Sequence, residues 1–160
     1  MSRPRDDAGR PRQDRPRDRL GRPLPRDGEG LDAAVEPVPD ELDLSPEDAL
    51  AYAQRLLDER RPFGAHEVLE AVWKASPPGE EDLWRALAQL AVAATHLERG
   101  NPTGAQALFS RAADGLATYR GQVPHGIAVD SLLEVASAGA ARAWSVPDAG
   151  PAFRLTSYFA

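Results

Sequence analysis

The fold is decided by residues 80–99, EEDLWRALAQLAVAATHLER. Apolar side chains recur in this stretch at helical spacing and form one stripe: Leu83, Leu87, Leu90, Ala94 and Leu97. A second, mixed stripe runs along the other side of the same helix: Arg85, Gln89, Val92 and His96. Acidic residues at the start of the stretch suit the positive end of the helix dipole. Because a helix with two faces turned away from solvent is typically central, we predict that this helix lies in the middle of a bundle.

The same periodicity predicts four more helices, at about residues 46–60, 62–74, 102–119 and 129–144. Proline and glycine punctuate them, with Ser45 as N-cap before Pro46, and Gly100-Asn101-Pro102 as a stop followed by a new start. Short connections favour antiparallel neighbours. The sequence therefore predicts an all-α fold, a single five-helix bundle of antiparallel helical hairpins. We expect this domain at residues 44–146, with a C-terminal extension at residues 147–160.

Residues 1–43 differ in composition from the rest of the chain. Proline, arginine, aspartate and glycine dominate, and large apolar side chains are scarce. Such a segment cannot bury enough surface to offset the entropy lost on ordering. One string, Arg3-Pro4-Arg5-Asp6, recurs as Arg15-Pro16-Arg17-Asp18, which indicates low complexity. We therefore predict a disordered N-terminal tail over residues 1–43.

Charge is divided unevenly between this tail and the body. The first 30 residues hold nine arginines and six acidic residues, whereas residues 31–160 hold ten basic and nineteen acidic ones. Aspartates interrupt the arginines and the tail has no aromatic residue, so we do not expect it to bind nucleic acid. The opposite charges favour self-docking instead. In that hypothesis Leu20 and Leu24 enter an apolar groove of the body, and residues 21–25 dock in extended form.

Several classes of protein are excluded by what the sequence lacks. It has no cysteine, which removes disulfides, thiolate zinc sites and cysteine nucleophiles. The N-terminus has no apolar region typical of a signal peptide. The most apolar stretch, residues 87–94, is far shorter than the roughly 20 residues that a membrane span requires. We therefore expect a cytoplasmic protein without a membrane partner.

The motif that points most directly to a functional site lies in the second predicted helix, at residues 63–73, FGAHEVLEAVW. His66 and Glu70 are separated by four residues and so share one helical face, and Trp73 lies one turn further along. If this helix pairs with the central one, the stripe with Gln89 and His96 faces the same edge. We predict a polar cleft there, formed by His66, Glu70, Trp73, Gln89 and His96. The set His66, Glu67, Glu70 and His96 would suit Zn²⁺ or Fe²⁺.

This motif resembles the signature Phe-x-Ala-His-Glu-x-x-Glu-x-x-Trp of the domain-of-unknown-function 309 family. The resemblance continues through residues 87–91 and His96 to residues 99–105, and it covers roughly Ser45 to Gly121. The tail strings at residues 15–18 and 21–25 look like the actinobacterial branch of that family. Gly64 departs from the larger, often polar residue associated with its position. The resemblance implies an all-helical fold and no established activity.

Two functions remain open at this point. The first is a binding or interaction module whose cleft recognises a protein or a small ligand, and the sequence favours this over an enzyme. The alternative is a metal-binding protein or metal-dependent hydrolase centred on His66, Glu67, Glu70 and His96. The motif is close to the zincin string His-Glu-x-x-His, but Glu70 replaces the second histidine ligand. A purely structural role, in which His66 and Glu70 bond across a helix interface, competes with both functions.

Weaker candidates lie elsewhere in the chain. Residues 99–104 place Arg99 and free backbone amides at a helix N-terminus, which could bind an anion. His125 stands between Pro124 and Gly126, and we expect it to be exposed in a loop. Trp84 and Trp144 are expected to pack in the core or at its edge.

Overall fold

The computed structural model of the chain describes residues 17–24, 35–39, 42–145 and 150–157. These residues contain α1 (Pro46–Asp58), α2 (Pro62–Ala75), α3 (Glu81–Glu98), α4 (Pro102–Ala117) and α5 (Val129–Ala141), with a short 3₁₀ helix, η2 (Pro124–Gly126), before α5. Two isolated β-bridges are the only extended pairings in the described part of the chain. The predicted all-α fold with five helices is confirmed.

The helices begin where the sequence predicts. Ser45 Oγ accepts a hydrogen bond from the backbone nitrogen of Asp48 at 3.1 Å, and Asn101 Oδ1 accepts one from Gly104 at 2.9 Å. Prolines stand in the first turns of α1, α2 and α4, where a missing backbone N–H costs nothing. Gly100 adopts the left-handed φ of +83° that ends α3. Local capping chemistry therefore sets these boundaries.

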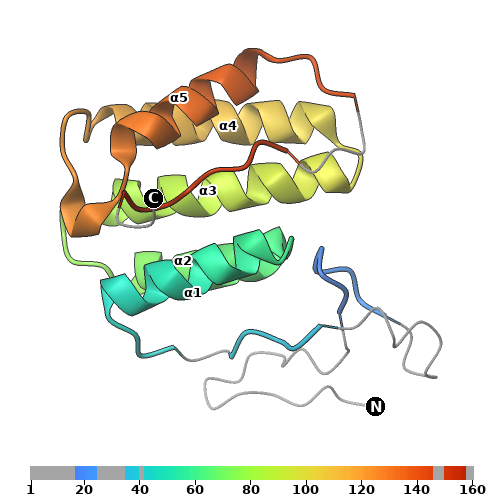
Figure 1. The fold of residues 1–160 in the computed structure, drawn as a ribbon, viewed down its shortest axis with the longest axis horizontal. Coiled ribbons are helices and arrows are strands. Elements are labelled where there is room, and N and C mark those ends of the chain that lie inside the picture. The colour runs from blue at the N-terminus through green and yellow to red at the C-terminus, as the bar shows by residue number, and fades with distance from the viewer. Residues whose placement is uncertain (1–16, 25–34, 40–41, 146–149, 158–160) are drawn as a thin grey trace.

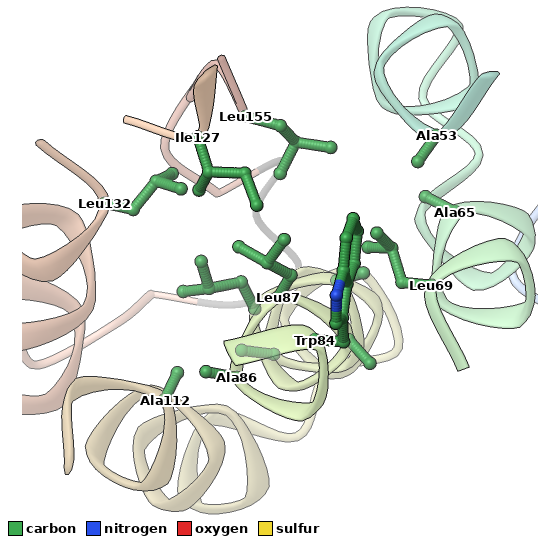
Figure 2. Packing of buried hydrophobic residues seen from close by; sticks show 14 of the residues in the cluster. Ala53, Ala65, Leu69, Trp84, Ala86, Leu87, Ala112, Ile127, Leu132 and Leu155 are labelled. Atoms are coloured by element: carbon green, nitrogen blue, oxygen red, sulfur yellow. The ribbon is translucent and has the colours of Figure 1, made fainter. Parts of the chain in front are cut away.

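Helix α3 is the centre of the bundle, as predicted, although the mixed stripe expected to face away from solvent is exposed at Arg85 and only half-buried at Gln89, Val92 and His96. In Figure 1, α1 and α2 lie on one side of α3, and α4 and α5 lie on the other. The leucines of its apolar stripe are fully buried, and Trp84 is 1% exposed. Figure 2 shows Trp84 beside Leu69 of α2, with Ile127 and Leu155 above Leu87. No helix of the described residues is long and apolar enough to cross a membrane.

The end of α5 differs from the expectation. The helix stops at Ala141, three residues before the predicted end at Trp144. The Trp144 ring stacks on Phe109 with 6.0 Å between ring centroids, and its Nε1 donates to the carbonyl of Gly139 at 3.0 Å. The chain turns back at this point because the indole packs against α4 and α5. This agrees with the expected packing role of Trp144 at the edge of the core.

Residues 150–157, within the predicted C-terminal extension, are part of the same core. Leu155 is fully buried, and its backbone nitrogen donates to Gln54 Oε1 at 2.8 Å. Its carbonyl accepts a hydrogen bond from Ala128 at 3.0 Å, and Thr156 forms a bridge with Ile127. This segment therefore crosses the bundle as a strap between α1 and the start of α5 (Figure 1).

Two segments of the predicted tail lie against the body. Residues 17–24, called the tail turn below, bury Leu20, and residues 35–39 bury Val38. Val38 packs beside Gly64, where an added Cβ would lie 3.5 Å from Val38 Cγ2 and 3.4 Å from Leu56 Cδ1. These are ordinary van der Waals distances, so a Cβ would fit here and the packing of Val38 and Leu56 does not itself require glycine. The disorder predicted for residues 1–16 and 25–34 concerns residues outside those described.

Candidate functional site

The signature residues of α2 divide between the core and one edge of the helix. Ala65, Val68 and Leu69 are fully buried in the core. His66, Glu67, Glu70 and Trp73 are half-buried on the other side. The helical spacing of the motif thus places its polar members together on one edge, as predicted from the sequence.

His66, Glu70 and Lys74 form a chain of contacts along this edge. His66 Nε2 donates to Glu70 Oε2 at 2.8 Å, and Lys74 Nζ lies 2.8 Å from Glu70 Oε1. Burial lowers the pKa of His66 below its ordinary value, although the Glu70 carboxylate opposes this shift. Burial alone would raise the pKa of Glu70, but the hydrogen bond from Lys74 and the interaction with His66 lower it overall. At neutral pH the pair is therefore a neutral imidazole beside an ionised carboxylate.

Two cation–π contacts set the register between α2 and α3. The Arg85 guanidinium lies 5.9 Å from the Trp73 ring, and that of Arg99 lies 5.7 Å from the Phe63 ring. The beginning of α2 therefore lies beside the end of α3. The Phe63 ring is also 5.5 Å from the His66 ring. We call this strip the α2–α3 edge; it consists of Phe63, His66, Glu70 and Trp73 from α2 and of Arg85 and Arg99 from α3. Gln89, predicted to belong to the same cleft, lines a pocket with Arg111 and Asp114 of α4.

His96, near the end of α3, has its own partner. Asn101 Nδ2 donates to His96 Nδ1 at 3.2 Å, which continues the cap of α4. Burial lowers the pKa of His96, and the nearby positive charge of Arg99 lowers it further. Among the described residues, no group of three or more His, Asp or Glu side chains lies close enough to hold a metal ion. Binding of Zn²⁺ or Fe²⁺ by His66, Glu67, Glu70 and His96 stays a prediction.

The tail turn covers the Phe63 end of this edge. Asp18 Oδ1 accepts hydrogen bonds from the backbone nitrogens of Leu20 and Arg22, both at 2.9 Å. Gly21 has a φ of +77°, and a Cβ at this position would lie 2.4 Å from ring carbons of Phe63. The docked segment is thus a closed turn rather than the extended form predicted for residues 21–25, because Asp18 and Gly21 close it locally. Pro25 lies outside the described residues.

Charged groups hold the tail turn in place. Arg19 Nη1 lies 2.6 Å from Glu98 Oε2, and Arg60 Nη2 lies 2.5 Å from Glu98 Oε1. The Glu98 side chain is only 5% exposed, so the two arginines compensate a buried charge. The Arg99 guanidinium donates to the Leu20 carbonyl. Arg99 therefore binds the tail turn, and Asn101 caps the adjacent helix, where the sequence suggested an anion site.

His125 corrects a second expectation from the sequence. It is half-buried, and its Nε2 lies 2.6 Å from Glu80 Oε1. Its ring centroid is 5.7 Å from that of Trp84. The prediction of an exposed loop residue is wrong because these partners lie about forty positions away in the sequence, where no local pattern indicates them. The string Pro124-His125-Gly126, with His125 at a φ of +54°, is the only local sign of an unusual position.

Residues 50–108 match a protein family described as domain of unknown function (DUF309). The match runs from α1 through the whole of α2 and α3 into α4, and it includes every residue of the α2–α3 edge. The resemblance drawn from the signature is thereby confirmed. No curated protein and no solved structure matches the chain. The chemistry of the site must therefore be derived from its geometry.

Proposed function

We propose that this chain, whose residues 50–108 match the DUF309 family, is an interaction module that binds a peptide turn at the Phe63 end of the α2–α3 edge. The observation that supports this most directly is the tail turn, a segment far from this edge in sequence that lies on it with a buried leucine. A surface that holds such a turn within the chain has the features needed to hold a similar turn from a partner.

The contacts of the tail turn define what the surface recognises. Leu20 supplies a buried apolar side chain, and Gly21 allows the backbone to approach the Phe63 ring. Arg19 pairs with the buried Glu98 carboxylate. The partner we propose is therefore a basic peptide with a leucine–glycine turn flanked by arginines. The acidic body of the domain favours encounters with such a peptide.

This proposal can be tested on the full chain. In the variant Leu20→Asp, the carboxylate prevents the tail turn from burying its side chain and so leaves the surface open. We expect a fluorescein-labelled peptide of residues 15–25 to bind this variant saturably, as measured by anisotropy. The wild-type chain should bind the peptide at least about tenfold more weakly, because its own tail competes at a high effective concentration.

Two control peptides separate specific recognition from charge attraction. A scrambled peptide of the same composition and a peptide with Leu20→Ala should both bind more weakly. Circular dichroism and thermal unfolding would show that the variant chain is folded. A folded Leu20→Asp chain that binds all three peptides equally, or none of them, would contradict the proposal.

A metal site is a second candidate, favoured by the 2.8 Å contact between His66 and Glu70. An imidazole and a carboxylate on one helical face are suitable ligands for Zn²⁺ or Fe²⁺, and Glu67 or His96 would have to join them. Elemental analysis of the purified chain and of His66→Ala tests this. Stoichiometric metal in the wild-type chain that is lost from the folded variant would support the metal site. The same metal content in both would exclude it.

A further inference from the structure

A cavity of about 280 Å³ lies at the other end of the α2–α3 pair, beside the loop that joins these helices. One of its walls is α2, which contributes Val68, Ala71, Val72 and Ala75. Small side chains on this wall leave the space open. By volume the cavity could hold about nine water molecules, which is enough for a short-chain organic ligand.

The polar groups of the cavity gather at one side, around His125. His125 Nε2 donates to Glu80 Oε1 at 2.6 Å, and Trp84 Nε1 donates to the same oxygen at 3.2 Å. Within the described residues, the second oxygen of Glu80 accepts no hydrogen bond. Because a carboxylate oxygen can only accept, Nε2 is the donor of this bond, and Nδ1 lies 3.6 Å from Glu47 Oε1. The site thus offers acceptors in excess of donors.

The charges around this cavity have one sign, apart from His125. Asp43 and Glu80 are in its lining, Glu47 lies beside the imidazole, and no arginine or lysine of the described residues contributes to the lining. The bond from His125 lowers the pKa of Glu80, so this carboxylate is ionised at neutral pH. A carboxylic acid or a phosphate would be repelled here. An ammonium group supplies three donors and a positive charge, which is what these acceptors lack.

We propose that this cavity binds a small primary amine with an apolar body. The ammonium group lies between the carboxylates of Glu80 and Glu47, and the apolar chain lies along Val68, Ala71 and Val72. The left-handed backbone of His125 points to the same site, because residues held in a sparsely populated conformation cluster where a side chain must be aimed. This site lies away from the tail turn and does not depend on the peptide-binding function.

The test uses n-hexylamine as the probe on the full chain. We expect saturable shifts of the Trp84 indole N–H and of the His125 ring protons in NMR titrations. n-Hexanol has the same shape without the charge and should bind at least about tenfold more weakly, because the loss of a charged hydrogen bond lowers affinity by this factor or more. Hexanoate should not bind, because the carboxylates of the site repel it. Equal affinity for the amine and the alcohol would overturn the proposal.

Variants show whether the amine binds where we place it. Glu80→Gln removes the charge but preserves the shape, so hexylamine should bind this variant at least about tenfold more weakly. Asp114→Asn removes an exposed carboxylate of α4 outside the cavity and serves as the matched control, with unchanged affinity. Ala71→Leu should block binding by filling the cavity. If Ala71→Leu does not fold, the test is the comparison of Glu80→Gln with Asp114→Asn. Equal affinities of these two variants for hexylamine would overturn the proposal.

Discussion

A glutamate lies at each end of the α2–α3 pair, Glu98 near the end of α3 and Glu80 at its N-cap, and the surroundings of the two carboxylates differ. At the Phe63 end, Glu98 is 5% exposed and contacts Arg19 and Arg60. At the loop end, Glu80 is 29% exposed and receives hydrogen bonds from His125 and Trp84. One carboxylate is enclosed by two full positive charges, whereas the other is left partly solvated beside a cavity. The difference separates a surface that the tail turn already occupies from one that is open beside a cavity.

Desolvation explains why the Phe63 end needs its cover. A carboxylate withdrawn from water is unfavourable unless opposite charges and hydrogen bonds compensate it. Arg60 lies in the loop between α1 and α2, but Arg19 comes from the tail turn, so burial of Glu98 and docking of the tail turn occur together. Glu80 needs no such cover because water still reaches it.

The largest effect should come from displacing the tail turn. Gly21→Ala introduces a Cβ that meets the Phe63 ring in a left-handed conformation, which would expose Leu20 and break its contacts. We expect the free energy of unfolding to fall by about 2–3 kcal/mol in urea titrations. Gly79→Ala is the matched control, because Gly79 has a φ of +93° but no atom near its Cβ position. It should cost about 1 kcal/mol. If the two variants lost the same free energy of unfolding, backbone strain alone would explain the effect at Gly21, and displacement of the tail turn would contribute nothing.

A pair of neutralising substitutions compares the two glutamates directly. Glu98→Gln removes a buried charge from between two arginines, and we expect it to lower the free energy of unfolding by about 1–2 kcal/mol. The arginines remain partly exposed, which keeps this loss below that of a fully buried pair. Glu80→Gln should cost about 0.5 kcal/mol or less, because its carboxylate is partly solvated. If Glu80→Gln proved the more costly, the distinction between the covered end and the open end would fail.

Much of the fold could be predicted because its determinants are local. The apolar stripe of α3, the cap at Ser45 and the Gly100-Asn101-Pro102 string act within a few residues. The contact between His66 and Glu70 was predictable for the same reason, since helix geometry places residues four apart side by side. The turn at residues 18–21 has a local signal in Asp18 and Gly21, although the sequence predicted that Leu20 and Leu24 dock with residues 21–25 in extended form.

The contacts that join distant segments could not be predicted. Leu155 bonds to Gln54, 101 positions away, and His125 bonds to Glu80, 45 positions away. Neither pair has a pattern within its own segment, because a single hydrogen bond between distant residues leaves no periodicity in the sequence. The strap and the cavity both depend on such contacts. The sequence therefore indicated the α2–α3 edge and missed the cavity at its end.

The smallest effect we predict concerns pH: the two histidines and Glu80 should lose their contributions to the free energy of unfolding in different pH ranges. Burial lowers the pKa of His66 and of His96 in the folded chain, so below a pH of about 6.5 the unfolded chain binds more protons at these residues and the free energy of unfolding falls. The pKa of Glu80 is lowered too, so its contribution is present above the ordinary pKa of a glutamate and is lost only below about pH 4.5.

Urea titrations at about pH 8, 6 and 5 would resolve these two ranges. His66→Gln and His96→Gln, each made separately, should reduce the loss of stability between pH 8 and pH 5. Glu80→Gln should leave this loss unchanged, because the wild-type carboxylate is still ionised in this range. A wild-type chain as stable at pH 5 as at pH 8 would contradict the burial of the two imidazoles. If Glu80→Gln, and not the histidine variants, reduced the loss of stability between pH 8 and pH 5, the group that titrates in this range would lie at the cavity instead.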